Sequence, residues 1–229
     1  MLGLLAPVPP DRRFRRISQL VAGLVLYGVT ASMLVLAGLG LDPWDVLHQG
    51  LSRTFGLGIG TWAILASFVV LLGWWPLRQR PGVGTLANAV AVGVVIDLVL
   101  ALVSPPHPLW ARVALVIGGV AGNGIATGLY IGAGLGPGAR DGLSTGIAAH
   151  GHSMRIVRTS IEAVVLVTGF LLGGTVGIGT VLYALAIGPI THRTIPALAI
   201  RHRAPGGAGL SSGPTSCAPA PAGTGPADA

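Results

Sequence analysis

The sequence predicts an all-α polytopic membrane helix bundle, with about six spans arranged as two inverted repeats of three spans each. Of its 229 residues, 52% are hydrophobic and only 9% are charged, whereas soluble domains carry about 25% charged residues. Long apolar runs follow one another along the chain, and a motif from the first half returns in altered form in the second. Such self-similarity predicts an internal repeat.

The repeated motif lies at 38–45 and recurs at 134–141, where two glycines and the last aspartate match at a spacing of 96. A second motif, at 82–85, recurs at 177–180 with a spacing of 95. Each half holds three apolar runs, and an odd number of spans makes the two halves enter the membrane in opposite directions. Inverted repeats of this kind are common in secondary transporters.

The individual spans follow from the lengths of the apolar runs. A bilayer core about 30 Å thick needs about 20 apolar helical residues, and the first four runs are long enough. The last two runs are shorter and are joined by 173–175, so a single hairpin or a broken helix is the alternative to two full spans. The six runs are 17–41, 59–77, 83–103, 112–135, 157–172 and 176–190.

These runs divide the chain into five parts. We expect a cytoplasmic Arg-rich arm at 1–16, a first membrane repeat at 17–103, an outer linker at 104–111, a second membrane repeat at 112–203 and a disordered cytoplasmic tail at 204–229. The tail is rich in Gly, Ala, Pro and Ser, a composition that does not form a packed core.

Arginine placement predicts the orientation. With the N-terminus inside, 12 of the 14 arginines fall in inner segments, so the positive-inside rule predicts a multi-pass cytoplasmic-membrane protein with both termini in the cytoplasm. Tryptophans at the predicted span ends would form an aromatic belt; they are Trp62, Trp74, Trp75 and Trp110.

Several classes of chemistry are disfavoured. The net charge of +7 comes from arginines scattered between apolar runs, so we predict no nucleic-acid partner. Cys217 is the single cysteine, and His150 and His152 lack a third ligand at suitable spacing, so no metal site is expected. The G-x-S-x-G pattern at 142–146 lies in a predicted short helix, not in a strand-to-helix elbow. We therefore predict no catalytic residue, no cofactor and no enzymatic activity.

Two short helices are candidate solute sites. Asp42 has the character of an N-cap, Pro43 of a first helical residue and Asp45 of a first-turn acid. We expect a short helix over 46–54 at or dipping into the outer surface, with an inner twin over 139–150. Asp45 and Asp141 then either line a solute pathway from opposite ends or only stabilise their helix N-termini; Arg140 is a further candidate.

Other candidate binding residues lie within the apolar runs. Asp97 ends a stripe of small residues at a spacing of four, and His192 ends the matching stripe in the second half. An acid inside a span costs about 2.5–3.5 kcal/mol on insertion scales and indicates function, although a structural hydrogen bond to a neighbouring span is equally compatible. Glu162 follows Arg158 by four residues, so it forms either an interfacial ion pair or a proton or cation site.

Taken together, the motifs at 38–45, 135–143, 171–180 and 188–189 resemble the YczE/YyaS/YitT family of bacterial multi-pass membrane proteins. The resemblance covers roughly 17–200 and implies a cytoplasmic-membrane protein without implying a reaction. YitT-type members carry a soluble domain after the membrane region. This chain has a Gly- and Pro-rich tail there, so we expect it to be nearer the YczE type.

Two functions are compatible with these observations. The first is binding or transport of a small solute between the two repeats, through the acids or through the N-termini of the short helices. The second is a non-transporting accessory protein that supports another membrane or biosynthetic system. The expected partners are the lipid bilayer, a small-molecule solute, and a second copy or another protein. Gly118 and Gly122 could serve dimerisation or packing within the chain.

Overall fold

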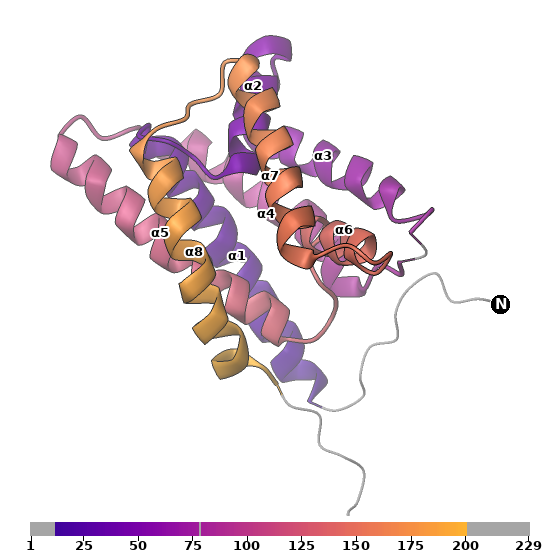
Figure 1. Cartoon of the computed structure of the whole chain (residues 1–229). Helices are drawn as coiled ribbons and strands as arrows, with labels where there is room; N and C mark the ends of the chain where they lie inside the picture. Colours follow the sequence, from indigo (N-terminus) through magenta and orange to yellow (C-terminus); the bar gives the residue numbers. More distant parts are fainter. Residues whose placement is uncertain (1–11, 78, 201–229) are drawn as a thin grey trace, which may run out of the picture.

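The computed structural model describes residues 12–77 and 79–200, and all regular secondary structure in this part of the chain is helical. Six longer helices form a bundle, and two short helices pack against them (Figure 1). The helices are α1 (Arg13–Ala37), α2 (Pro43–Phe55), α3 (Ile59–Gly73), α4 (Val83–Leu102), α5 (Leu109–Gly132), α6 (Ala139–Ala148), α7 (Met154–Leu171) and α8 (Ile178–Leu198).

The apolar runs and the two short helices of the sequence all appear as helices. Among the described residues, α1, α4 and α5 are each long and apolar enough to cross a membrane, and α2 with α3 adds a fourth crossing if this pair, bent by 113°, is one span. The α7 and α8 helices are separate and barely contact each other, unlike the two arms of a hairpin. The α8 helix also runs past the predicted end at 190 and contains Pro189 and Pro196.

The first helix begins earlier than predicted. The α1 helix starts at Arg13, inside the predicted arm at 1–16, and Arg16 at the end of that arm is only 1% exposed. The Arg16 guanidinium donates to the carbonyl of Ala133 at 2.8 Å, which gives the buried charge a polar partner. The rest of the predicted arm, 1–11, and the predicted tail, 204–229, lie outside the described residues.

A matching contact joins the opposite ends of the same two helices. Arg112, near the N-terminus of α5, donates through Nε to the carbonyl of Ala37 at 2.6 Å. Arg16 and Arg112 are 96 residues apart, as are Ala37 and Ala133. Each arginine therefore satisfies a carbonyl at the C-terminal end of the other helix, where backbone acceptors lack intrahelical partners.

The loops after α1 and α5 exchange contacts in the same way. The backbone N–H of Gly84 donates to Leu135 at 2.9 Å, and that of Gly179 donates to Leu39 at 2.9 Å. Close to these bonds, Gly40 and Gly136 have φ of 122° and 125°, which L side chains rarely adopt. The loop of each half thus packs against the last helix of the other half.

The α3 and α4 helices pack closely at two glycines. A side chain at either Gly60 or Gly93 would collide with the backbone of the other. Beside this contact, Asp97 accepts from the N–H of Gly60 and from the hydroxyl of Thr61, both at 2.7 Å. By contrast, a side chain at Gly188 of α8 would meet nothing within 4 Å. The glycines of the α5 candidate motif contact α1 within the chain, Gly118 at Met33 and Gly122 at Thr30.

One tryptophan assigned to the aromatic belt is instead part of the core. Trp74 is 2% exposed, and its indole N–H donates to the carbonyl of Ala139 at 3.0 Å. This contact holds the N-terminus of α6 against the end of α3. Trp75 and Trp110, in contrast, are largely exposed, as a belt position requires.

Candidate functional site

A partly open cavity of about 120 Å³ lies in the middle of the bundle, and each of the eight helices contributes to its wall. A volume of about 10–15 Å³ is enough to hold one water molecule. The cavity can therefore accommodate several water molecules or a small polar solute. Its wall carries hydroxyl, amide, carboxyl and guanidinium groups next to aromatic rings. The polar side chains include Tyr27, Asp42, Ser67, Asn88, Thr127, Tyr130, Arg140, Asp141, Ser144, Arg158, Glu162, Tyr183 and Thr191.

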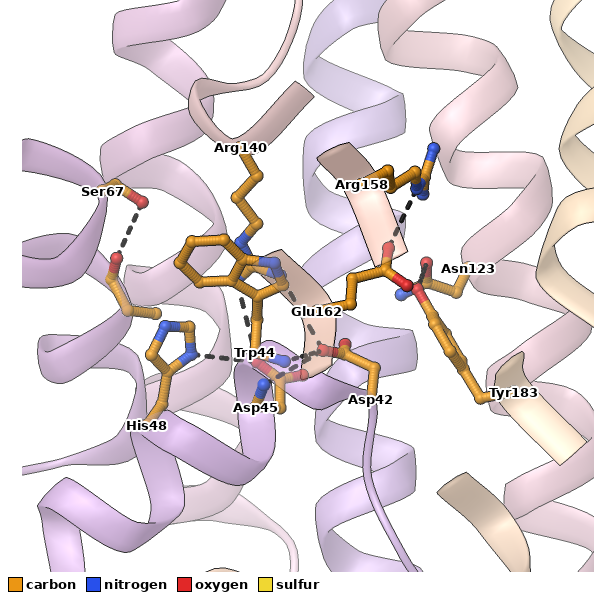
Figure 2. A network of polar contacts seen from close by, with 11 residues as sticks. Asp42, Trp44, Asp45, His48, Ser67, Asn123, Arg140, Arg158, Glu162 and Tyr183 are labelled. Carbon is orange, nitrogen blue, oxygen red and sulfur yellow. Dashed lines mark hydrogen bonds and ion pairs between the residues drawn. The ribbon is translucent and has the colours of Figure 1, made fainter. Parts of the chain in front are cut away.

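The N-termini of α2 and α6 meet at this cavity. The Arg140 guanidinium lies 5.0 Å from the centre of the Trp44 ring, a cation–π distance. It also lies 3.9 Å from a carboxylate oxygen of Asp42 and 3.9 Å from one of Asp45. Figure 2 shows these four side chains gathered at one place. The expectation that Asp45 and Asp141 line a pathway from opposite ends is therefore wrong, because both short helices point their N-termini inward.

The N-terminus of α2 is organised by Asp42, as the sequence predicts. One oxygen of its carboxyl group accepts from the N–H groups of Trp44 and Asp45 at 2.9 and 3.0 Å. A carboxyl oxygen of Asp45 and Nδ1 of His48 share a hydrogen bond at 3.1 Å. Both aspartates are only 1% exposed, and the second carboxylate oxygen of each has no hydrogen-bond partner in the described part of the chain.

The N-terminus of α6 is arranged differently, since its N-cap is Gly138, which has no capping side chain. Asp141 lies in the first turn, where a negative charge favours the helix dipole. Its carboxylate accepts from the Tyr130 hydroxyl at 2.8 Å. Tyr130 packs edge-on against Tyr27, with 6.0 Å between ring centres, so one wall of the cavity is aromatic.

The opposite wall comes from α7 and α8. Arg158 and Glu162, one turn apart on α7, form an ion pair at 2.9 Å, and both side chains are partly exposed. From α8, the Tyr183 hydroxyl donates to Asn123 at 3.2 Å. The amide nitrogen of Asn123 is buried and has no partner among the described residues.

A family model described as a family of unknown function, DUF6198, matches residues 14–196, which include nearly all of the eight helices. The chain belongs to the DUF6198 family. It is 40% identical to an uncharacterized protein of Haemophilus influenzae over 181 residues, which cover 79% of this chain and 83% of that protein. No solved structure matches it.

Two Bacillus subtilis proteins are also similar to this DUF6198 chain. The uncharacterized membrane protein YczE is 32% identical over 179 residues, covering 76% of this chain and 83% of YczE. The uncharacterized protein YyaS is 29% identical over 181 residues, covering 76% of this chain and 89% of YyaS. These matches confirm the resemblance to YczE and YyaS. With the apolar helices, they identify the chain as a membrane protein.

The candidate residues of the DUF6198 chain fall into two groups. Arg140, Asp141 and Glu162 line the cavity, and Asp45 lies directly behind Arg140. Asp97 binds the N-terminus of α3 and is not part of the cavity wall. His192 is exposed and also lies outside the wall. In the described residues, no group of three or more His, Cys, Asp or Glu side chains is placed to hold a metal ion.

Two further residues of the site were not among the sequence candidates. Asp42, interpreted from the sequence only as a cap, lines the cavity, and its second carboxylate oxygen is buried without a partner in the described residues. Trp44 was not proposed at all. The available signal is its position: Trp44 and Arg140 occupy the same place in the motif that recurs at a spacing of 96.

Proposed function

We propose that this DUF6198 protein binds a small polar solute in the central cavity and carries it across the cytoplasmic membrane. The observation that carries this proposal is the cavity itself, into which the N-termini of two short helices bring Asp42, Trp44 and Arg140. Ligand sites in membrane transporters are commonly built at the middle of the bundle, from the ends of discontinuous helices at the interface between repeats.

The proposal includes two inverted repeats. In support, contacts between the halves come in pairs with a spacing of about 96. Arg16 binds Ala133 while Arg112 binds Ala37. The stacked Trp44 and Arg140 are equivalent residues in contact with each other, which is what a two-fold axis through the cavity would produce.

Movement of the solute would use the difference between the two halves. The α3 and α4 helices are closely packed, whereas α7 and α8 barely contact each other. Both pairs border the cavity. If α7 and α8 came to pack closely while α3 and α4 moved apart, the cavity would close beside α7 and open beside α3. This exchange is the alternating access expected of inverted repeats.

We also propose that both termini lie in the cytoplasm and that the chain makes six crossings. In support, the start of α1 and the end of α8 lie at the same end of the bundle, where Arg16 donates to the carbonyl of Ile200 at 3.4 Å (Figure 1). An impermeant maleimide tests this topology through Cys217. Cys217 should react only in permeabilised cells, and labelling in intact cells would overturn the proposed orientation.

Solute binding is tested by thermal unfolding of the full-length protein in detergent against a broad panel of metabolites and ions. A solute that binds only the folded state stabilises it by about 2.7 kcal/mol at a concentration of 100 times Kd. We expect at least one solute class to stabilise the wild type. The effect should weaken in Glu162→Gln, because Glu162 lines the cavity.

Asp97→Asn is the matched control, since it also neutralises an acid of the bundle but lies outside the cavity wall. It should lower the unfolding temperature and leave the solute-induced increase intact. If no solute stabilises the wild type, or if Glu162→Gln responds like the wild type, solute binding at this site is wrong. The accessory role would then be favoured, and a protein partner should be sought by cross-linking in cells.

A further inference from the structure

The charges around the cavity are unequal. Carboxyl groups of Asp42, Asp141 and Glu162 line it, against the guanidinium groups of Arg140 and Arg158. Behind this wall lies the further carboxyl group of Asp45, 3.9 Å from Arg140. Carboxyl groups therefore outnumber guanidinium groups around the cavity. A ligand with positive charge and N–H donors would supply the partners that buried carboxyl groups need.

An anionic ligand fits the same cavity poorly, although two helix N-termini face it. The N–H groups at the start of α2 are already bound by Asp42. At the start of α6, a Cβ atom added to Gly138 would lie 3.3 Å from a carboxylate oxygen of Asp141 and 3.1 Å from the Tyr130 hydroxyl. The α2 N–H groups are therefore occupied by a carboxylate, and an external anion at the start of α6 would meet the nearby carboxylate of Asp141.

An independent observation is the second carboxylate oxygen of Asp42. Asp42 is 1% exposed, lines the cavity, and leaves this oxygen without a hydrogen-bond partner in the described residues. A buried acceptor of this kind costs about 1–3 kcal/mol when it stays unpaired, and more when it is charged. A ligand with N–H donors would satisfy it.

The cation now nearest to Asp42 is a side chain of the protein. Arg140 approaches both Asp42 and Asp45 only to 3.9 Å, beyond hydrogen-bond distance, while it stacks on Trp44. A guanidinium held so loosely can be displaced. The carboxylates and the Trp44 ring together form a binding site that suits a planar or compact cation, since aromatic faces attract cations.

We infer that the solute is a small organic cation with N–H donors, which binds Asp42 and the Trp44 ring in place of Arg140. This inference rests on the proposed solute-binding function and names the class of solute. It commits to an organic cation because the described residues offer no metal-binding group. The volume of about 120 Å³ limits the ligand to a few non-hydrogen atoms beside the displaced arginine.

The test is calorimetric binding of methylguanidinium chloride to the full-length protein in detergent, with sodium acetate as the anionic probe at matched ionic strength. Wild type should bind methylguanidinium and not acetate. Asp42→Asn should lose most of this binding while remaining folded, because Asn is as good an N-cap as Asp. Arg140→Gln should bind methylguanidinium about tenfold more tightly, since a like charge beside a binding site lowers affinity.

Asp97→Asn again serves as the control and should bind methylguanidinium like the wild type. Binding of acetate, abolished by Arg140→Gln, would overturn the inference in favour of an anion. A neutral solute or an anion that stabilises the wild type in the broad panel would also overturn it, yet leave solute binding intact. If neither the panel nor methylguanidinium binds, both the inference and the proposed function fail.

Discussion

The α3–α4 pair and the α7–α8 pair border the same cavity, but they are packed in opposite ways. Gly60 brings α3 onto α4 at Gly93, and Asp97 ties the N-terminus of α3 to α4. At a spacing of 95 from Gly93 and Asp97, α8 carries Gly188, which faces open space, and His192, which is exposed. A small residue on one helix is therefore not enough for close packing, because the partner helix must supply a matching one.

This difference assigns separate roles to residues that look alike in the sequence. Thr85, Ala89, Gly93 and Asp97 form a stripe that matches Thr180, Ala184, Gly188 and His192. The first stripe ends in a carboxylate that accepts two hydrogen bonds from α3. The second ends in an exposed histidine. Substitutions at equivalent positions should consequently have unequal effects.

The largest expected effect is from Gly93→Leu, which places a side chain where the backbone of Gly60 lies. Overpacking a tight contact costs about 1–3 kcal/mol, and we expect the upper end, because the obstacle is backbone and cannot change rotamer. Thermal unfolding in detergent measures the loss. Gly188→Leu is the matched control and should stay within about 0.5 kcal/mol of wild type, as a change in open space does. Equal losses would contradict the difference between the two helix pairs.

A smaller effect is expected from Asp97→Ala. This change removes both hydrogen bonds to α3 and leaves the N–H of Gly60 without its acceptor. Hydrogen bonds to charged groups contribute about 1.5–3 kcal/mol, so we expect a loss of about 2 kcal/mol on unfolding. His192→Ala should be near neutral because that side chain is exposed. A larger loss of unfolding free energy from His192→Ala than from Asp97→Ala would show that His192, and not Asp97, stabilises its helix pair.

The smallest effect is expected from Arg158→Gln, which breaks the pair with Glu162 on α7. Both side chains are partly exposed and lie one turn apart, and such pairs contribute about 0.2–0.5 kcal/mol. The difference from wild type should shrink at high salt, since screening weakens exposed pairs. A loss as large as that of Asp97→Ala would mean that this pair contributes more than an exposed pair within one helix can.

Features set by neighbours along the chain were predictable from sequence. The six apolar runs, the two short helices, and Asp42 with Pro43 at the beginning of α2 all follow from local length and capping rules. The meeting of α2 and α6 was not predictable in this way. It depends on how deeply two helices from different halves enter the bundle, which periodicity does not report.

The same limit applies to the partners of charged residues. The sequence places Arg140 among the solute-site candidates and Arg16 in an Arg-rich arm, and it indicates no partner for either. In the structure, Arg140 stacks on Trp44, and Arg16 is buried against Ala133. The partners of both arginines lie on distant segments, so only the tertiary arrangement identifies them.

The crossed arginine contacts also bear on how the chain is made. The carbonyl of Ala37 accepts a hydrogen bond from Arg112, which is synthesised 75 residues later. At about 5–20 residues per second this delay lasts several seconds. Until Arg112 is made, this carbonyl lacks the partner that it has in the folded chain. Two fragments divided within 104–111 should accordingly be degraded when expressed singly and should accumulate when expressed together.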